Sequence, residues 1–277
     1  MAEDHDLLGN VARTAEAIKG LAEVVPIYPD VIQPAAREIG KALGTVGKAV
    51  NVLLAPLESV IWGYEKFQQI FVPLLEERLE GIAKDRLITP KLLIAGPTIE
   101  GLKYAGQEPS LRDMYVNLLA TAMDRETAEK AHPAFAEIIR QLTPDEARIV
   151  QYLAVEKTTP QLTYTATYRT DEPGTRHVFP RPLFTLIQID VDCEYPHLLA
   201  SYLDNLRRLQ IIGLGELRNA YLFINDERFI RLHNHPLVKQ EKLYLESAKI
   251  MHTLLAGEFG LTAFGTQFCA ACVTRAQ

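Results

Sequence analysis

The sequence has few cysteines, no long apolar run and no secretory signal. Three cysteines in 277 residues are too few, and odd in number, for a disulfide framework, which favours a reducing cytosol. The acidic first ten residues lack the basic region and apolar core of a signal peptide. A membrane-spanning helix needs about 20 mainly apolar residues, and the sequence has no such stretch. We therefore expect a cytoplasmic protein, with attachment at the membrane periphery left open.

The sequence also lacks the short motifs that mark common enzymes. It contains no GxSxG, P-loop, GxGxxG or HExxH pattern, each of which sets nucleophiles, phosphate-binding backbone or metal ligands at a fixed spacing. No catalytic residue and no cofactor are therefore predicted, and an enzyme is the less favoured class. The net charge of −6 opposes a general attraction to nucleic acid but leaves room for a local basic patch.

Helical periodicity is what the first half of the chain does contain. Apolar residues recur at helical spacing over residues 6–25, 35–54 and 57–75, and Pro73 is expected to kink the third stretch. After Pro160, β-branched and aromatic residues alternate instead. The predicted fold is therefore mainly α with a smaller α+β part. Its predicted regions are an N-terminal helical region (1–88), a helical core (89–155) and a winged-helix-like α+β region with strand insertions (156–277).

Five residues of the N-terminal region are candidates for contact with a partner or a membrane surface. They are Gly40, Gly44, Gly47, Trp62 and Tyr64. The glycines lie close to one helical face and permit close helix packing, while the aromatic residues are either core residues or an exposed anchor. Charged residues interrupt this region, so tight soluble packing is favoured. A membrane-active effector formed by amphipathic helices in residues 35–75 is kept as an alternative.

Residues 107–153 predict three consecutive helices, each with its own start signal. Ser110 and Asp113 have the spacing of a capping box, and Pro133 suits a first helical position. Thr143-Pro144-Asp145-Glu146 combines an N-cap threonine, a proline at the first position and a glutamate at the third. An earlier helix is expected to start at Thr89-Pro90 and to be interrupted at Gly96-Pro97. The middle of the chain is thus predicted to be entirely helical.

Several motifs in this order carry a resemblance to a known family. They are Leu118-Leu119-Ala120, His132-Pro133, Pro144-Asp145-Glu146-Ala147 and, near the end, Leu261-Thr262-Ala263-Phe264-Gly265 with Phe268 and Cys272. Over roughly residues 90–273 the chain resembles the Abi-alpha family of bacterial abortive-infection proteins, a domain of otherwise unknown function. The resemblance implies a role in phage defence, and it implies no catalytic residue.

The C-terminal part alternates strands with helices. Residues 162–168 and 177–179 read as strands around a turn at 171–174, and a helix is expected over 196–209. Residues 221–224 read as a further strand, and residues 229–255 fit either helix or strand. A helix that ends in Ile211-Ile212-Gly213-Leu214 before a hairpin is similar to a winged-helix domain.

Two clusters could hold a metal ion. Asp190, Asp192 and Glu194 would share one face of a strand, with Cys193 and His197 nearby, and carboxylates suit a hard cation. An acidic loop that caps the helix at Pro196 is the preferred interpretation. Cys269 and Cys272 have CxxC spacing, but a zinc site needs a second ligand pair that the sequence lacks, so core packing is preferred. The segment His233-Asn234-His235-Pro236 is interpreted as a turn.

Arginines of the C-terminal part form the best basic patch. They are Arg207, Arg208, Arg218, Arg228 and Arg231. In a winged helix they would lie on the central helix and the wing, where phosphates are contacted. Because carboxylates lie close to these arginines in the sequence, the preferred interpretation is that they are ordinary solvated surface residues.

Taken together, the sequence predicts an abortive-infection-type defence protein that acts by binding a partner rather than by catalysis. A protein partner or self-association is favoured, and nucleic acid and a membrane surface are kept as other partners. The alternatives are a membrane-active effector, a nucleic-acid-binding winged helix, and a metal-dependent enzyme that uses the Asp190–Glu194 carboxylates.

Overall fold

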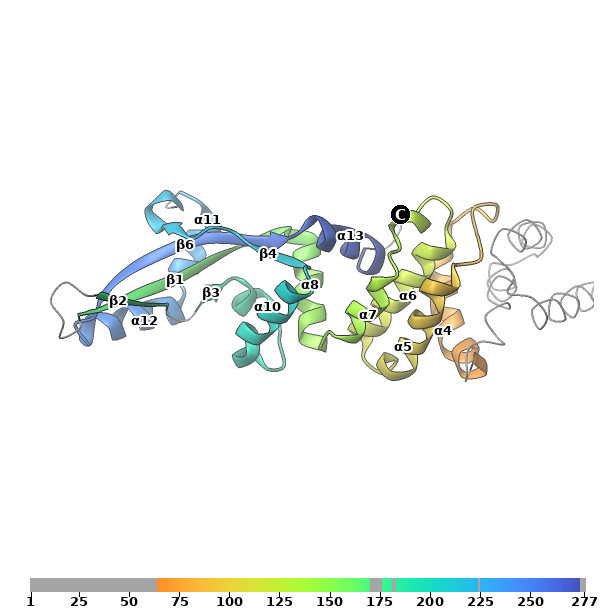
Figure 1. The fold of residues 1–277 in the computed structure, drawn as a ribbon, viewed down its shortest axis with the longest axis horizontal. Helices are drawn as coiled ribbons and strands as arrows, with labels where there is room; N and C mark the ends of the chain where they lie inside the picture. The colour runs from red at the N-terminus through yellow and green to blue at the C-terminus, as the bar shows by residue number, and fades with distance from the viewer. Residues whose placement is uncertain (1–63, 170–175, 181–182, 224, 275–277) are drawn as a thin grey trace, which may run out of the picture. The chain divides into compact units, whose positions relative to one another are not determined.

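The computed structural model describes residues 64–169, 176–180, 183–223 and 225–274 (Figure 1). These residues form two compact units. The N-terminal unit is the described part of Met1–Gln141 together with that of Ala270–Gln277, and the C-terminal unit is Leu142–Cys269. The chain therefore enters the C-terminal unit at Leu142 and returns to the N-terminal unit at Ala270, within its last helix.

The N-terminal unit is helical. Its elements are α4 (Tyr64–Leu79), α5 (Leu92–Ala105), α6 (Pro109–Met123), η1 (Ala128–Lys130) and α7 (Ala134–Arg140). Helix α6 lies at its centre, since 11 of its 15 residues are buried. The polar residues Asn117, Thr121 and Asp124 are buried as well. They are tolerated there because each forms hydrogen bonds.

Two expectations about helix starts in this unit were wrong. Helix α6 begins at Pro109 with Glu108 as its N-cap and no side-chain capping bond, so Ser110 lies inside the first turn and does not cap it. Helix α5 begins at Leu92 and runs through Gly96-Pro97. Pro97 removes only one backbone hydrogen bond near the helix start, which is too small a loss to end the helix.

The C-terminal unit opens with the predicted capping box. Thr143 Oγ accepts a hydrogen bond from the Glu146 backbone, and the Glu146 carboxylate accepts one from the Thr143 N–H at 2.6 Å. Helix α8 (Pro144–Glu156) follows. Lys157 at φ 66° ends the helix, and β1 begins at once. The predicted boundary between residues 155 and 156 lies next to the change from helix to strand, whereas the compact units divide after Gln141.

The sheet of this unit is antiparallel. Its strands are β1 (Thr158–Arg169), β2 (Arg176–Pro180), β3 (Phe184–Thr185), β4 (Ile212–Leu214), β5 (Arg218–Asn219) and β6 (Met251–Leu261). The order is β2-β1-β6-β4, with β3 paired to β1 and β5 paired to β6. Tyr164 lies opposite Leu254 and Ala166 opposite His252, so the even-numbered residues of both long strands share one face. A helical part followed by an α+β part is confirmed.

Helices and short 3-10 turns complete the C-terminal unit. They are α9 (Ile187–Asp190), η2 (Pro196–Leu198), α10 (Leu199–Arg208), η3 (Ala220–Phe223), α11 (Glu227–His233), α12 (Pro236–Ser247) and α13 (Ala263–Cys272), of which the part from Ala270 onward belongs to the N-terminal unit. The strand expected over 221–224 was wrong, because residues up to Phe223 form η3. The Asn219 side chain accepts a 3.1 Å hydrogen bond from the Tyr221 N–H, a local turn that competes with strand pairing.

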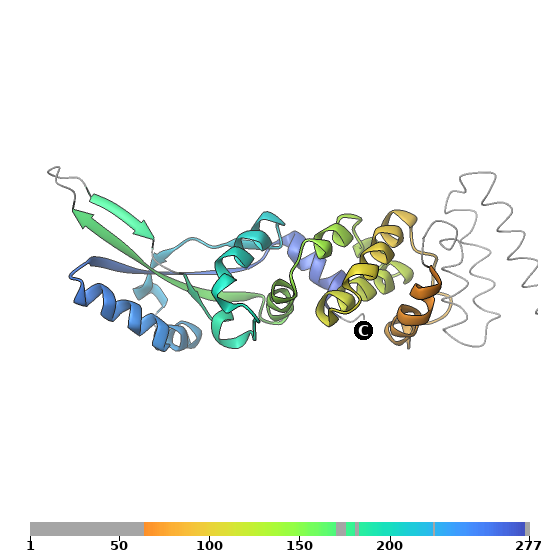
Figure 2. The same ribbon diagram turned by 90° about the horizontal axis from the view of Figure 1, so that it is seen from below.

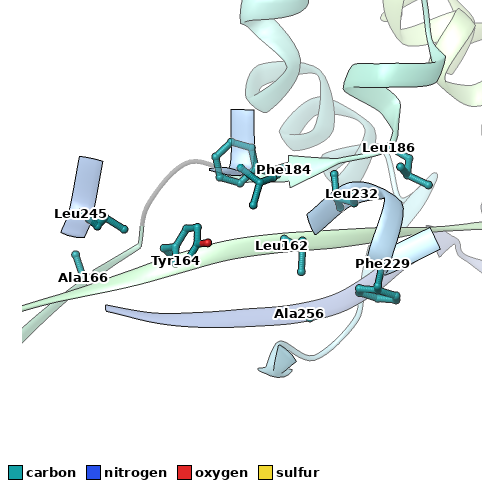
Figure 3. Close-up of a cluster of buried hydrophobic side chains, with 10 residues drawn as sticks. Leu162, Tyr164, Ala166, Phe184, Leu186, Phe229, Leu232, Leu245 and Ala256 are labelled. Atoms are coloured by element: carbon teal, nitrogen blue, oxygen red, sulfur yellow. The ribbon is translucent and has the colours of Figure 1, made fainter. Parts of the chain in front are cut away.

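One apolar cluster joins these elements on the even-numbered face of the sheet (Figure 3). Leu162, Tyr164 and Ala166 from β1 meet Phe229 from α11 and Leu245 from α12, and all five are buried. Helix α12 runs along the sheet as a result (Figure 2). The ambiguous stretch 229–255 therefore divides into two helices that cover the sheet and the start of a strand that belongs to it.

Candidate functional site

An open cavity of about 570 Å³ lies in the C-terminal unit, bordered by β1, β6, η3, α11 and α12. Its volume is in the range of small-molecule sites. Its main apolar lining consists of Leu162, Phe223, Phe229, Ile230 and Leu254. Its polar lining includes Tyr164, Asn219, Tyr221, His233, Lys242 and His252.

The alternation of the two long strands explains the floor of the cavity. Tyr164 and Leu254 are register partners, and Leu162 and His252 lie two residues from them on the same face. The wall is aromatic, since Phe223 of η3 stacks on Phe229 of α11 with ring centroids 4.4 Å apart. Phe229 is itself buried, so this wall is anchored in the core cluster.

The polar lining of the cavity is cationic or neutral. Among the described residues that line it, none is an aspartate or a glutamate. His252 Nδ1 lies 2.9 Å from the Ile250 carbonyl, and because a carbonyl only accepts, Nδ1 carries the hydrogen. The ring packs edge-on against Tyr164 at 5.4 Å. Lys242 contacts Glu246 at 3.8 Å, with both side chains about half exposed.

The Tyr164 hydroxyl is a hydrogen-bond donor rather than a base. Burial, followed by the negative charges of Glu246 and Glu241, raises its pKa above the ordinary value. The phenol therefore stays protonated at neutral pH. With Lys242 and two histidines beside apolar walls, the lining suits binding of a ligand that has an apolar body and a polar end.

The sequence did not reveal this site. Its lining comes from five separate segments, which are 162–164, 219–223, 229–233, residue 242 and 252–254. Residues 221–224 were predicted as a strand, and residues 229–255 were left ambiguous between helix and strand. The consecutive apolar residues Tyr221, Leu222 and Phe223 were a usable signal. Tyr221 and Leu222 are exposed by 83% and 68%.

The acidic cluster is dispersed. Asp190 ends α9 and forms an ion pair with Arg231, with an Oδ2–Nη1 distance of 3.0 Å. Residues 191–195 follow without strand structure, so the face that Asp190, Asp192 and Glu194 were to share does not exist. Over the described ranges, no three His, Cys, Asp or Glu side chains are grouped closely enough to hold a metal ion.

The acidic loop does not cap the helix that starts at Pro196. A carboxylate from α8 binds the backbone of this loop instead. Helix η2 has Tyr195 as its N-cap, with no side-chain bond. Instead, the buried Asp145 carboxylate of α8 accepts hydrogen bonds from the backbone N–H groups of Glu194 and Tyr195 at 2.8 and 2.9 Å. It also accepts one from the Tyr202 hydroxyl at 2.9 Å. Burial and then this bond raise the pKa of Tyr202 to about 12. Asp145 thus fixes the loop that carries the acidic residues.

Most of the predicted basic patch is paired with carboxylates. Arg218 contacts Glu216 at 2.9 Å, Arg228 bridges Asp226 and Glu258, and Arg231 pairs with Asp190. Arg207 and Arg208 lie together in the exposed last turn of α10. Asn205 accepts two hydrogen bonds from Arg208.

The cysteines and histidines have structural positions. Cys269 and Cys272 are both buried in α13, which confirms core packing, and burial raises the pKa of Cys269 to about 12. His235 is the N-cap of α12 and accepts from the Leu237 N–H, whereas His233 lines the cavity.

The N-terminal candidates Gly40, Gly44, Gly47 and Trp62 lie outside the described residues, and Tyr64 is the first residue of α4. The membrane-active alternative therefore stays a prediction. Within the described part of the chain, no helix is both long and apolar enough to cross a bilayer.

Comparison with known proteins gives a distant structural likeness and a match to a family model. A solved structure titled as an uncharacterized protein from the hydrocarbon-degrading marine bacterium Alcanivorax borkumensis SK2 is 13% identical, with a TM-score of 0.31 over 54% of this chain and 96% of that one. A likeness of that size supports no argument. No curated protein matches significantly. The family model described as Abortive infection alpha matches residues 63–272. Because that match covers most of the chain, the protein belongs to the Abortive infection alpha family.

Proposed function

We propose that this protein is an anti-phage defence protein that acts by binding a protein partner rather than by catalysis. The family supports the abortive-infection role. The observation on which the binding mode rests is a set of exposed apolar side chains: Tyr221 and Ile230, which line the cavity, and Leu222, which follows Tyr221 in η3. Their exposed fractions are 83%, 42% and 68%. Exposed aromatic and aliphatic side chains of this kind are typical of the anchors of protein interfaces.

Phage plating on cells that express the full chain tests this proposal. The variant Tyr221→Ser with Leu222→Ser is expected to lose protection while keeping its fold, since both side chains are exposed. Tyr104→Ser is the matched control, because Tyr104 is exposed by 80% but belongs to the N-terminal unit. Protection by the double variant equal to that of the wild type would contradict the proposal, as would an equal loss in the control.

A second candidate function is nucleic-acid binding by the C-terminal unit. It is favoured by Arg207 and Arg208, which share the exposed last turn of α10 and would contact phosphates if this unit bound a duplex as a winged helix does. The three other arginines of the predicted patch have carboxylate partners, and for that reason the protein partner is placed first.

A further inference from the structure

We infer that the cavity of the C-terminal unit binds a small amphipathic anion, with an apolar chain or ring between Phe229 and Leu254 and a carboxylate beside Lys242. This ligand site goes beyond the proposed defence role, and its test requires no defence activity. The inference rests on the shape of the cavity, the composition of its lining and the charge at its edge.

The apolar lining is suited to a hydrocarbon body. Phe229 and Leu162 are 3% and 2% exposed, so the core cluster holds them in place. Phe223 stacks on Phe229 and extends the same wall. Close packing leaves few voids larger than a water molecule in a protein interior, whereas this cavity has about 570 Å³ and is open to solvent. Filling it would remove apolar surface from water, which favours binding.

The charges select an anion over a neutral or cationic ligand. Lys242, His233 and His252 line the cavity, and the described lining contains no carboxylate. A cationic ligand would find no opposite charge within the lining. An anion would find the ammonium group of Lys242, together with the hydroxyl of Tyr164, which stays a donor because burial, followed by the charges of Glu246 and Glu241 outside the lining, raises its pKa.

The ion pair that Lys242 already forms does not prevent this role. Its distance to Glu246 is 3.8 Å, and both side chains are about half exposed. Ion pairs of that kind contribute little, so Lys242 can exchange this partner for a ligand carboxylate. Glu246 lies outside the lining.

Isothermal titration of the purified full chain with decanoate, decanol and decyltrimethylammonium, each kept monomeric, tests the inference. Decanoate is expected to bind saturably with one site, and the ammonium compound is expected not to bind. Lys242→Ala should weaken decanoate binding about tenfold, the loss of one charge-assisted contact. Lys239→Ala is the matched control on the same helix, since Lys239 is exposed and does not line the cavity.

A second pair of variants locates the site. Ile230→Glu places a carboxylate in the lining at a side chain that is 42% exposed, so the fold should persist and decanoate binding should vanish. Leu243→Glu adds the same charge at a residue that is 64% exposed and outside the lining, so binding should persist. Circular dichroism confirms folding of each variant.

Several outcomes would overturn the inference. They are no binding of decanoate, equal binding of decanol, and equal effects of the matched variants. A further titration with anionic phospholipid vesicles distinguishes binding of a free ligand from binding of a membrane surface. Binding to vesicles without binding of monomeric decanoate would mean that the surface recognises a bilayer and that the cavity has no small ligand.

Discussion

The side-chain amide of Asn117 donates a 3.0 Å hydrogen bond to the backbone carbonyl of Cys272, 155 residues later in the chain. Thr121 donates to the carbonyl of Ala271 at 3.0 Å in the same way. The last carbonyls of a helix lack partners within the helix, so α6 supplies partners for the end of α13. Arg78 in turn donates to the Asn117 side chain at 2.8 Å. The end of the matched family region is thereby held in the N-terminal unit by buried polar contacts.

Asn117→Ala is therefore expected to destabilise the protein. It leaves a buried carbonyl and the Arg78 guanidinium without this partner, at a cost of about 2 kcal/mol in the free energy of unfolding. Urea unfolding followed by circular dichroism measures the change. Glu137→Ala is the control, since it removes an exposed ion pair with Arg140 and should cost less than about 1 kcal/mol. Equal stability of the two variants would contradict this role of Asn117.

Asp145→Ala should be one of the most damaging single changes in the C-terminal unit. The buried carboxylate accepts bonds from two backbone N–H groups and from Tyr202, so its removal strands three donors. We expect a loss of about 3 kcal/mol. Tyr202→Phe removes only one of these bonds and should cost about 1 kcal/mol. Thermal and urea unfolding of both variants measure the two losses in the free energy of unfolding. A smaller loss for Asp145→Ala than for Tyr202→Phe would be incompatible with this network.

The contribution of Asp145 should also depend on pH. Desolvation alone would raise its pKa, but the hydrogen bonds from Tyr195, Glu194 and Tyr202, with the charge of Arg148, lower it below the ordinary value. The unfolded carboxyl titrates near about 3.9 and the folded one lower, so the stabilisation is complete above that pH and is lost as pH falls through the folded pKa.

The measurement is the difference in unfolding free energy between wild type and Asp145→Asn as a function of pH. It should be constant above about pH 5 and shrink below about pH 4. A difference that grows on acidification would reverse the sign of the proposed linkage.

Gly265→Ala should disrupt the start of α13. A Cβ at this position would lie 2.0 Å from the Ile211 carbonyl oxygen, so backbone must move. The Gly265 N–H also donates to Thr262 Oγ at 2.8 Å. Gly96→Ala is the matched control inside α5, where the nearest atom would be an ordinary 3.8 Å away, and it should stabilise by up to about 1 kcal/mol. Melting temperatures are expected to move in opposite directions, and a shared direction would contradict this contrast.

The nucleic-acid alternative makes a prediction about salt. If α10 contacts a duplex, Arg207→Ala with Arg208→Ala should weaken binding to every sequence alike and flatten the slope of log affinity against log salt by roughly 0.9 per lost phosphate contact. Fluorescence anisotropy with a mixed-sequence duplex at low salt measures it. No binding by the wild type, or an unchanged slope in the variant, would exclude this function for α10.

Local sequence signals determined much of the secondary structure. The Thr143 capping box forms as its spacing predicts, because the residues that form it are neighbours in the chain. The alternation in residues 162–168 appears in β1, and Leu261-Thr262 leads from β6 into α13. In each case the deciding interactions lie within a few residues, so no knowledge of the tertiary fold was needed.

The tertiary structure alone decided where polar groups are buried and where the cavity lies. The burial of Asn117 depends on its hydrogen bond to the Cys272 carbonyl, which is 155 residues away in the chain. Asp145 was recognised only as part of a helix start, although its carboxylate holds a loop nearly 50 residues further on. The cavity needs β1, β6, η3, α11 and α12 to meet. The spacing of residues in the sequence cannot predict this arrangement, because the arrangement depends on which buried faces pack against one another.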